Sequence, residues 1–261
     1  MIIYKYLPPS RIDVLEDSRI RFTQPAALND PFETFPCFLE FGPWLLDKVH
    51  QQSIDKFGMK DAKNMLQQQQ TLVVQKLLDI PKIFSKHFVI LSLSKVRDNL
   101  LMWSHYSDSH RGFVIGFDSS SAFFSPGRGK AKDGLKMVRY SNNRYLVPKN
   151  GFNSLDDPNL REANAKLFFT KGSYWRYERE MRILAHPDSA DVVLPDPKGY
   201  DIRLFNFPEE SVKEVIIGFR MAEPDQRRVF NLIRSKFSHA TIGKALPHES
   251  RFALIVEMFT N

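Results

Sequence analysis

The chain has 261 residues, with 37 Lys and Arg against 30 Asp and Glu, and a formal net charge of +7. Its 43% hydrophobic and 13% aromatic residues exclude a disordered chain and indicate a substantial buried core. The single Cys37 excludes an internal disulfide and a thiolate zinc cluster, and no 18-residue apolar run predicts a membrane span. We therefore expect a cytoplasmic protein with no membrane partner. The positive charge favours polyanions such as nucleic acid, but charge alone does not select a partner.

The first part of the chain predicts short strands separated by turns. Strand patterns cover residues 2–7 and 19–23, with a helical turn between them at 11–15. The segment 24–33 is rich in turn residues. Its Asn29-Asp30-Pro31 predicts a corner that either plugs Phe32 into the core or lines a site.

Helical periodicity replaces the strand pattern from Trp44 to about Lys86. Two amphipathic helices are predicted there, the first ending near Gly58 and the second at Pro81. We interpret residues 44–86 as a helical hairpin inserted into a single domain that spans residues 1–261. Such an insertion covers or adapts a site rather than supplying its chemistry.

The stretch 101–118 is unusually dense in chemically active side chains. A strand is predicted at 87–94 with Ser92 and Ser94 on one face, followed by a short helix capped by Asp98 and ending at Tyr106. A turn then leads into a strand at 113–117. The density of imidazole and aromatic groups predicts a polar pocket; the residues that supply them are Trp103, His105, Tyr106 and His110.

Each histidine of this stretch also fits a plain structural role as a hydrogen-bonded side chain. A metal site formed by both histidines with Asp108 would rest on ligands from one local turn, so we predict no metal. Residues 119–134 read as a mobile, basic loop, followed by a strand at 135–140 and by a helix that opens at Asp156-Asp157-Pro158.

A second dense segment covers residues 171–185. A strand beginning near Tyr177 would place Glu178, Glu180 and Arg182 on one face. Two carboxylates this close repel unless a cation lies between them or one takes up a proton. The alternatives are a salt-bridged surface strand, with Arg182 as partner, and the edge of a pocket.

The last third of the chain is regular and contains no solenoid repeat. A helix is predicted at 224–237, and strands are predicted at 192–194, 202–207, 212–218, 241–245 and 252–259. Helices and strands do not alternate as in βαβ units, so the fold class is α+β with a mixed, largely antiparallel central sheet.

Four blocks together resemble the bacterial family known as domain of unknown function 2971. They are Asn-Asp-Pro-Phe-Glu at 29–33, Met-Trp-Ser-His-Tyr with His-x-Gly-Phe and Gly-Phe-Asp at 102–118, Trp-x-Tyr-Glu-x-Glu-x-Arg at 175–182, and Ile-Ile-Gly at 216–218.

The layout is also distantly similar to ADP-ribosyltransferases, including DNA-targeting toxins of toxin-antitoxin systems. This resemblance implies a sheet of ADP-ribosyltransferase-like type, NAD as substrate, and Glu180 as the catalytic glutamate with Glu178 as its paired carboxylate. Further implications are a nucleic acid acceptor, an antitoxin partner and a role in phage defence. The nicotinamide-binding strands would be the first strand, with Tyr4, Lys5 and Tyr6, and the one that carries Ser92 or Ser94. The first strand departs from the family pattern, because it has no Arg or His.

The chemistry of that reaction is met by groups in this chain. A carboxylate stabilises the oxocarbenium charge on the ribose, an aromatic ring holds nicotinamide and a cation binds the pyrophosphate. Glu180 can supply the first group, Trp103 or Tyr106 the second, and Lys5 or Arg111 the third. His105, Tyr106 and His110 would then form a substrate-positioning wall opposite Glu180.

Two other classes remain open. One is a nucleic-acid-binding or nuclease-like defence protein with His105, His110 and Glu180 as acid and base groups. The other is a non-catalytic sensor that binds a nucleotide.

Overall fold

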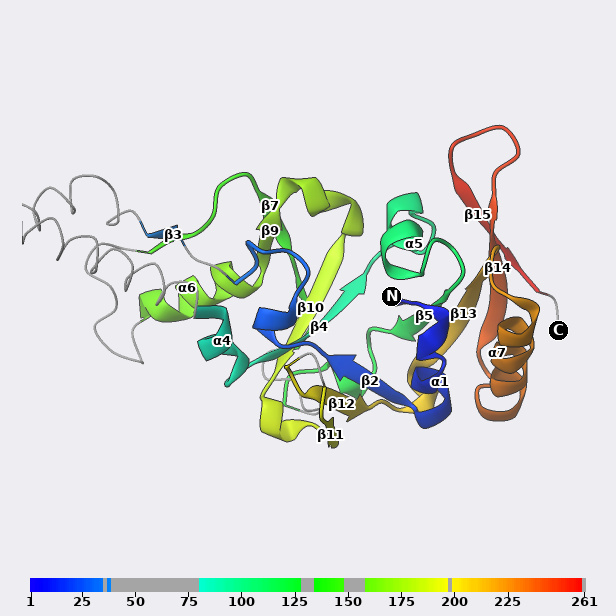
Figure 1. Cartoon of the computed structure of the whole chain (residues 1–261), viewed down its shortest axis with the longest axis horizontal. Coiled ribbons are helices and arrows are strands. Elements are labelled where there is room, and N and C mark those ends of the chain that lie inside the picture. Colours follow the sequence, from blue (N-terminus) through cyan, green and yellow to red (C-terminus); the bar gives the residue numbers. More distant parts are fainter. Residues whose placement is uncertain (35–36, 39–79, 128–133, 148–157, 197–198, 260–261) are drawn as a thin grey trace, which may run out of the picture. The chain divides into compact units, whose positions relative to one another are not determined.

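The computed structural model describes residues 1–34, 37–38, 80–127, 134–147, 158–196 and 199–259 (Figure 1). The chain divides into two compact units: Met1–Gln24, Phe88–Val138 and Tyr174–Asn261 form the first, and Pro25–His87 with Arg139–Ser173 form the second. Most of the predicted helical hairpin at 44–86 lies outside the described residues, so its two helices stay a prediction.

The first unit is built on an eight-stranded sheet in the order β15-β14-β13-β5-β1-β4-β10-β6. Only β13 and β14 run parallel, and every other neighbouring pair is antiparallel. The α+β class with a largely antiparallel sheet is confirmed. The strands are β1 (Ile2–Leu7), β4 (Val89–Ser94), β5 (Phe113–Asp118), β6 (Lys136–Met137), β10 (Glu180–Ala185), β13 (Val212–Gly218), β14 (Thr241–Pro247) and β15 (Leu254–Met258).

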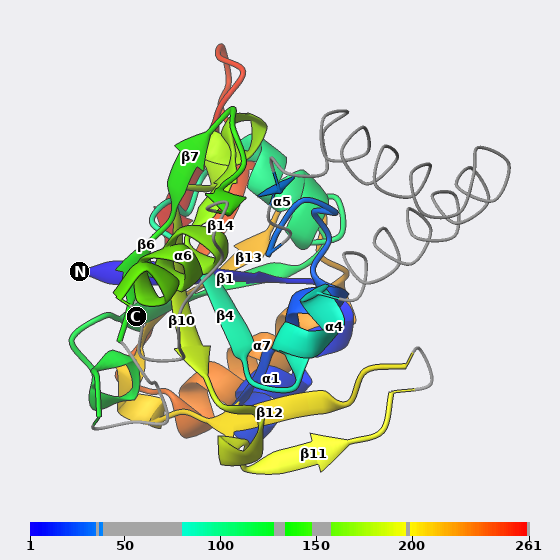
Figure 2. The same ribbon diagram turned by 90° about the vertical axis from the view of Figure 1, so that its left-hand side faces the viewer.

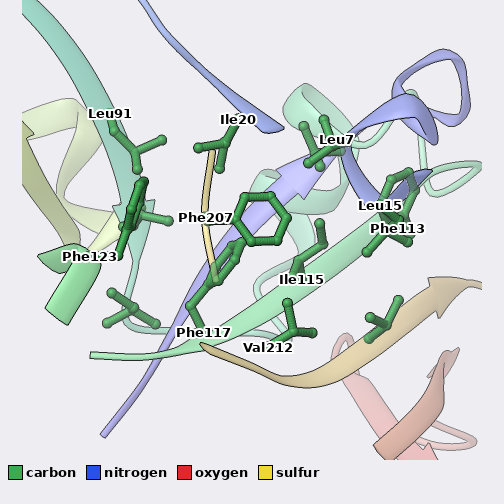
Figure 3. Packing of buried hydrophobic residues seen from close by; sticks show 14 of the residues in the cluster. Leu7, Leu15, Ile20, Leu91, Phe113, Ile115, Phe117, Phe123, Phe207 and Val212 are labelled. Atoms are coloured by element: carbon green, nitrogen blue, oxygen red, sulfur yellow. The ribbon is translucent and has the colours of Figure 1, made fainter. Parts of the chain in front are cut away.

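One face of this sheet is covered by apolar elements. Side chains alternate between the faces of a strand, so Ile3 and Leu7 of β1 point to this side with Ile115 and Phe117 of β5 (Figure 3). The covering elements are α1 (Asp13–Asp17), α7 (Glu223–Lys236) and a three-stranded sheet of β2 (Arg19–Phe22), β12 (Ile202–Asn206) and β11 (Val192–Leu194). This buried cluster is the main source of stability, at about 1.5–3 kcal/mol for each large apolar side chain.

The opposite face carries Tyr4 and Tyr6 of β1, and it is covered by α5 (Leu100–Tyr106). Met102 and Trp103 of α5 complete a second, smaller cluster there. Figure 2 shows α5 on one side of the sheet and α1 and α7 on the other. The polar residues predicted to form a site belong mostly to the α5 face.

The second unit contains α4 (Ile80–Ser85), α6 (Pro158–Phe168) and two parallel strand pairs. The pairs are β7 (Arg139–Ser141) with β9 (Thr170–Gly172), and β3 (Cys37–Phe38) with β8 (Leu146–Val147). The corner at 29–34 is held here by a buried ion pair, because Lys171 Nζ lies 3.0 Å from Glu33 Oε1. Phe32 is 62% exposed, so the expectation that it plugs the core is wrong.

Short 3₁₀ helices account for several differences from the sequence prediction. They are η1 (Pro9–Arg11), η2 (Pro25–Ala27), η4 (Ala122–Phe124), η5 (Ser173–Glu178), η6 (Pro187–Ser189) and η7 (Glu209–Ser211). The strand predicted from Tyr177 begins only at Glu180, because η5 occupies the residues before it. The loop predicted at 119–134 contains η4, whose Phe123 and Phe124 are buried in the core.

Two boundaries were also predicted wrongly. The helix predicted to end at Pro81 lies outside the described residues, and Pro81 itself belongs to α4. Asn99, not Asp98, caps α5, because its Oδ1 accepts hydrogen bonds from Leu101 and Met102. The strand predicted at 135–140 is divided at Val138 into β6 and β7, which belong to different sheets.

Across the described parts of the chain, no helix is both long enough and apolar enough to pass through a bilayer.

Candidate functional site

Three of the predicted site residues lie in one row across three neighbouring strands. Tyr4 of β1 is opposite Ser94 of β4, and Ser94 is opposite Glu180 of β10. Because paired residues in a sheet project to the same side, all three side chains face α5. The first strand, the Ser92/Ser94 strand and the late glutamate strand are thus direct neighbours.

The pairing between β1 and β4 is limited to this row. All six residues of β1 pair with β5, but β1 pairs with β4 only at Tyr4 and Ser94. The other end of β4 leaves β1, and Ile90 exchanges two 2.8 Å backbone hydrogen bonds with Thr23 instead. The sheet therefore has a local gap between β1 and β4.

Lys5 reaches into this gap from the face opposite Tyr4. Its Nζ donates a hydrogen bond of 3.0 Å to the carbonyl oxygen of Ser92. Burial lowers the pKa of Lys5 to about 8, although the carboxylates of Glu180 and Glu178 act in the opposite direction. Lys5 is thus a half-buried amine that contacts β4, the strand between β1 and the carboxylate strand β10.

Glu180 is held by Arg182, two residues along β10. Arg182 Nε and Nη2 lie 2.5 and 2.9 Å from Glu180 Oε1 and Oε2, and both residues are at least 97% buried. A bidentate pair of this kind fixes the geometry of the carboxylate. Of the two alternatives for this strand, the predicted ion pair with Arg182 is present, but it is buried and does not lie on the surface.

Glu178 is held from the opposite side by α5. Tyr106 Oη donates a hydrogen bond of 2.6 Å to Glu178 Oε1. The preceding residues pair as well, because His105 Nδ1 lies 3.0 Å from Tyr177 Oη. Ser94 Oγ donates to the backbone carbonyl of Glu178 at 2.6 Å. Two consecutive residues of α5 thus contact two consecutive residues of η5.

Trp103 and Tyr6 lie deeper and pack against each other. Their rings meet edge to face at 5.6 Å, and Trp103 is fully buried. Trp103 Nε1 donates to the carbonyl of Arg97 and Tyr6 Oη donates to the carbonyl of Val96, both at 2.8 Å. In this structure the two aromatic residues fix the backbone that leads into α5.

His110 lies at a different place from His105. It packs against Trp103 and Phe219, and its Nε2 lies 3.3 Å from Ser104 Oγ. Burial, and then the charge of Arg220, lower the pKa of His110, so its ring is neutral at pH 7. The structure therefore does not bring the two histidines to one point.

The turn that carries His110 is conformationally unusual. Asp108, Ser109 and His110 all have positive φ, between 46° and 68°. A Cβ on Gly218 would lie 2.0 Å from the His110 carbonyl oxygen, so only glycine permits this close approach. The Ile-Ile-Gly block at the end of β13 thus packs directly on the turn. Arg111, a predicted pyrophosphate ligand, is exposed and lies 3.3 Å from Asp108 Oδ1.

A second acidic group is close to Tyr4. Arg97 Nη1 lies 2.7 Å from Glu214 Oε2, and Glu214 is opposite Gly116, which is in turn opposite Tyr4. Burial, followed by Glu214, raises the pKa of Tyr4 to about 12. The phenol therefore stays protonated at physiological pH.

An open groove of about 690 Å³ lies beside the Tyr106–Glu178 contact. Three chain segments line it, and sequence reasoning had singled out only Asp98, as a helix cap, and Tyr177, as a neighbour of the carboxylates. The lining residues are Val96, Asp98, Asn99, Leu100, Leu101, Arg176, Tyr177, Arg179, Phe252, Ala253 and Leu254. The aromatic and charged residues around Glu178 in the sequence were the one signal that pointed to this groove. Among the described residues, no group of three or more His, Cys, Asp or Glu side chains could hold a metal ion.

Comparison with known proteins gives one match. Residues 102–183, about a third of the chain, match the family model described as "Protein of unknown function (DUF2971)". The matched segment covers nearly all of both dense blocks of the sequence, and it confirms the predicted resemblance to that family. No curated protein and no solved structure matches the chain.

Proposed function

We propose that this chain is a NAD-dependent ADP-ribosyltransferase whose site lies on the α5 face of the eight-stranded sheet. The observation that carries the proposal is the single row of Tyr4, Ser94 and Glu180 on three adjacent strands, beside the gap between β1 and β4. The distant similarity to ADP-ribosyltransferases assigns the first strand, the Ser92/Ser94 strand and the glutamate strand to one site, and their adjacency supports it.

The proposed reaction breaks the bond between C1′ of the ribose and the nicotinamide nitrogen. The bonding electrons leave with nicotinamide, which becomes neutral, and the positive charge develops on the ribose ring. An acceptor nucleophile then bonds to C1′ and loses its proton. A fixed carboxylate beside the ribose stabilises the charge as it forms.

Glu180 has the electrostatic properties that this role needs. Its pairing with Arg182 fixes the position of the carboxylate and supplies a counter-charge that favours the ionised form. Glu178, fixed by Tyr106, is the second carboxylate and would orient a ribose or the acceptor. His105 and Tyr106 would form part of the wall opposite.

The acceptor and the biological setting belong to the same proposal. The net charge of +7 favours a nucleic acid acceptor, and the resemblance favours a toxin or phage-defence protein with a protein antitoxin.

One observation favours a second candidate function, a nucleotide sensor that binds without turnover. Glu178 and Glu180 are each only 3% exposed, and both oxygens of Glu180 contact Arg182. A ribose reaches these carboxylates only if side chains above them move aside.

Incubation with NAD, followed by chromatography of free nicotinamide, tests the proposal. Wild type is expected to release nicotinamide, Glu180→Gln to lose this activity, and the exposed Glu257→Gln to retain it. Saturable NAD binding without nicotinamide release would support the sensor. Cleavage of RNA or DNA in the absence of NAD would support the nuclease-like alternative.

A further inference from the structure

We propose that the open groove between the segments 96–101, 176–179 and 252–254 binds a nucleoside diphosphate. The inference rests on the proposed function in one respect, because it assigns to this groove the adenosine diphosphate part of NAD. The groove volume of about 690 Å³ lies within the range of roughly 300–1,000 Å³ that is usual for ligand pockets.

Two arginines supply the groove with positive charge. Arg176 and Arg179 are both exposed, and they stand at the end of η5 and just after it. Arg179 has φ of 43°, a conformation that costs energy in a residue with a side chain and that clusters at ligand sites. Guanidinium groups bind phosphate oxygens in a planar, two-point geometry. A diphosphate is therefore the anion that this pair of residues fits.

Two aromatic rings stand in the same groove. Phe252 is fully exposed in the connection between β14 and β15, where no core packing explains it. Tyr177 is oriented by His105 at 3.0 Å and by the ring of Trp175, whose centroid lies 6.1 Å away. Bases stack on such rings without strong sequence preference, at about 1–3 kcal/mol for each base.

Polar groups for a sugar come from the segment 96–101. Asp98 is exposed in the groove and can accept hydrogen bonds from two neighbouring ribose hydroxyls. Asn99, whose Oδ1 caps α5, also lines the groove and carries an amide group that can donate to a sugar. The segment 176–179 thus matches the phosphates, the same segment and Phe252 match the base, and the segment 96–101 matches the sugar.

The groove wall is rigid. The carbonyls of Val96 and Arg97 are held by Tyr6 and Trp103 at 2.8 Å, and these two rings are buried. A wall fixed from behind loses little conformational entropy when a ligand binds. This also gives Trp103 and Tyr6 a role in binding that requires no direct contact with the ligand.

Isothermal titration calorimetry with ADP, adenosine and inorganic pyrophosphate tests the inference. ADP is expected to bind more tightly than either part alone. Arg179→Gln should weaken the binding of ADP by about 10-fold to 100-fold and leave the binding of adenosine nearly unchanged. Phe252→Ser should weaken the binding of both. Arg227→Gln, on the exposed face of α7, is the matched control and should change neither.

Several outcomes would overturn the inference: absence of ADP binding, ADP binding that neither groove variant affects, or binding of single-stranded oligonucleotides without ADP binding. The same samples are assayed for nicotinamide release, which separates the two proposals. ADP binding without nicotinamide release would contradict the proposed transferase activity and support the proposed ADP site in the groove. Nicotinamide release would support the transferase activity. If both groove variants also left the KM for NAD unchanged, the proposed ADP site in the groove would be wrong.

Discussion

Tyr106 Oη donates a hydrogen bond of 2.6 Å to Glu178 Oε1 and so joins α5 to η5 across 72 positions of the sequence. Glu178 is 3% exposed, so this hydroxyl replaces water that the carboxylate would otherwise bind. The contact connects the two dense blocks of the sequence, and both contacting residues lie within the segment 102–183 that matches the family model.

Removal of that hydroxyl should destabilise the protein. Tyr106→Phe is expected to lower the free energy of unfolding by about 1.5–3 kcal/mol, because a buried charged acceptor loses a donor. Urea denaturation followed by circular dichroism measures the change. His105→Ala, one residue earlier and exposed, should change stability by less than about 0.5 kcal/mol. Equal effects of the two variants would count against the importance of the Glu178 contact.

The buried pair on β10 predicts a larger effect. Arg182→Met leaves Glu180 buried without its cation and should cost about 3–5 kcal/mol. The double variant Glu180→Leu/Arg182→Met should recover most of that loss, because no charge remains. Arg228→Met breaks the exposed 2.7 Å pair with Glu16 and should cost under about 1 kcal/mol. A single Arg182 variant as stable as the Arg228 variant would contradict a buried ion pair.

Lys5 predicts a pH dependence of stability. Its folded-state pKa of about 8 lies below the ordinary 10.5, so the unfolded chain binds more protons between these values. The free energy of unfolding contributed by Lys5 therefore increases from pH 8 upward, and below pH 8 the penalty for burying the charge is complete. Above pH 10 the raised pKa of Tyr4 acts in the opposite direction, so the test stays below that pH.

Lys5→Met removes this contribution. Between pH 7.5 and 9.5 the free energy of unfolding of the wild type should rise relative to that of Lys5→Met by about 1–2 kcal/mol. Chemical denaturation at the two pH values measures the difference. Parallel pH dependences of the two proteins would show that the Lys5 ammonium is not buried.

Gly218 predicts a steric effect at the turn that carries His110. A Cβ there would lie 2.0 Å from the His110 carbonyl, so Gly218→Ala should displace the turn and cost more than about 2 kcal/mol. Gly127→Ala is the control, since its added Cβ meets nothing and only its φ of 68° is unfavourable, at about 1 kcal/mol. Thermal unfolding compares them, and equal midpoints would contradict the close approach.

Most strands of the first unit could be predicted from the sequence because they are short apolar or alternating runs bounded by turn residues. The runs at 2–7, 87–94 and 212–218 give β1, β4 and β13 within two residues. The order of the strands could not be predicted, because pairing joins residues far apart in the chain. The row of Tyr4, Ser94 and Glu180 is therefore visible only in the structure.

The main errors of the sequence prediction concern the start of β10, the cap of α5 and the groove. The alternating pattern at 177–183 predicts a strand from Tyr177, but η5 continues to Glu178 and turns that carboxylate toward Tyr106. The choice between Asp98 and Asn99 as helix cap depends on one residue of register, which composition does not fix. The groove brings together three distant segments, so only the residues around Glu178 gave any indication of it.

The role of Glu180 as the catalytic carboxylate is tested by the initial rate of nicotinamide release from NAD for four proteins: wild type, Glu180→Gln, Glu178→Gln and Glu257→Gln. Glu180→Gln is expected to lower the rate by at least about 100-fold, which is the usual effect of losing one group that stabilises transition-state charge. Glu257→Gln should match the wild type, and Glu178→Gln should fall between them. A Glu180→Gln protein that releases nicotinamide at the wild-type rate would contradict the account.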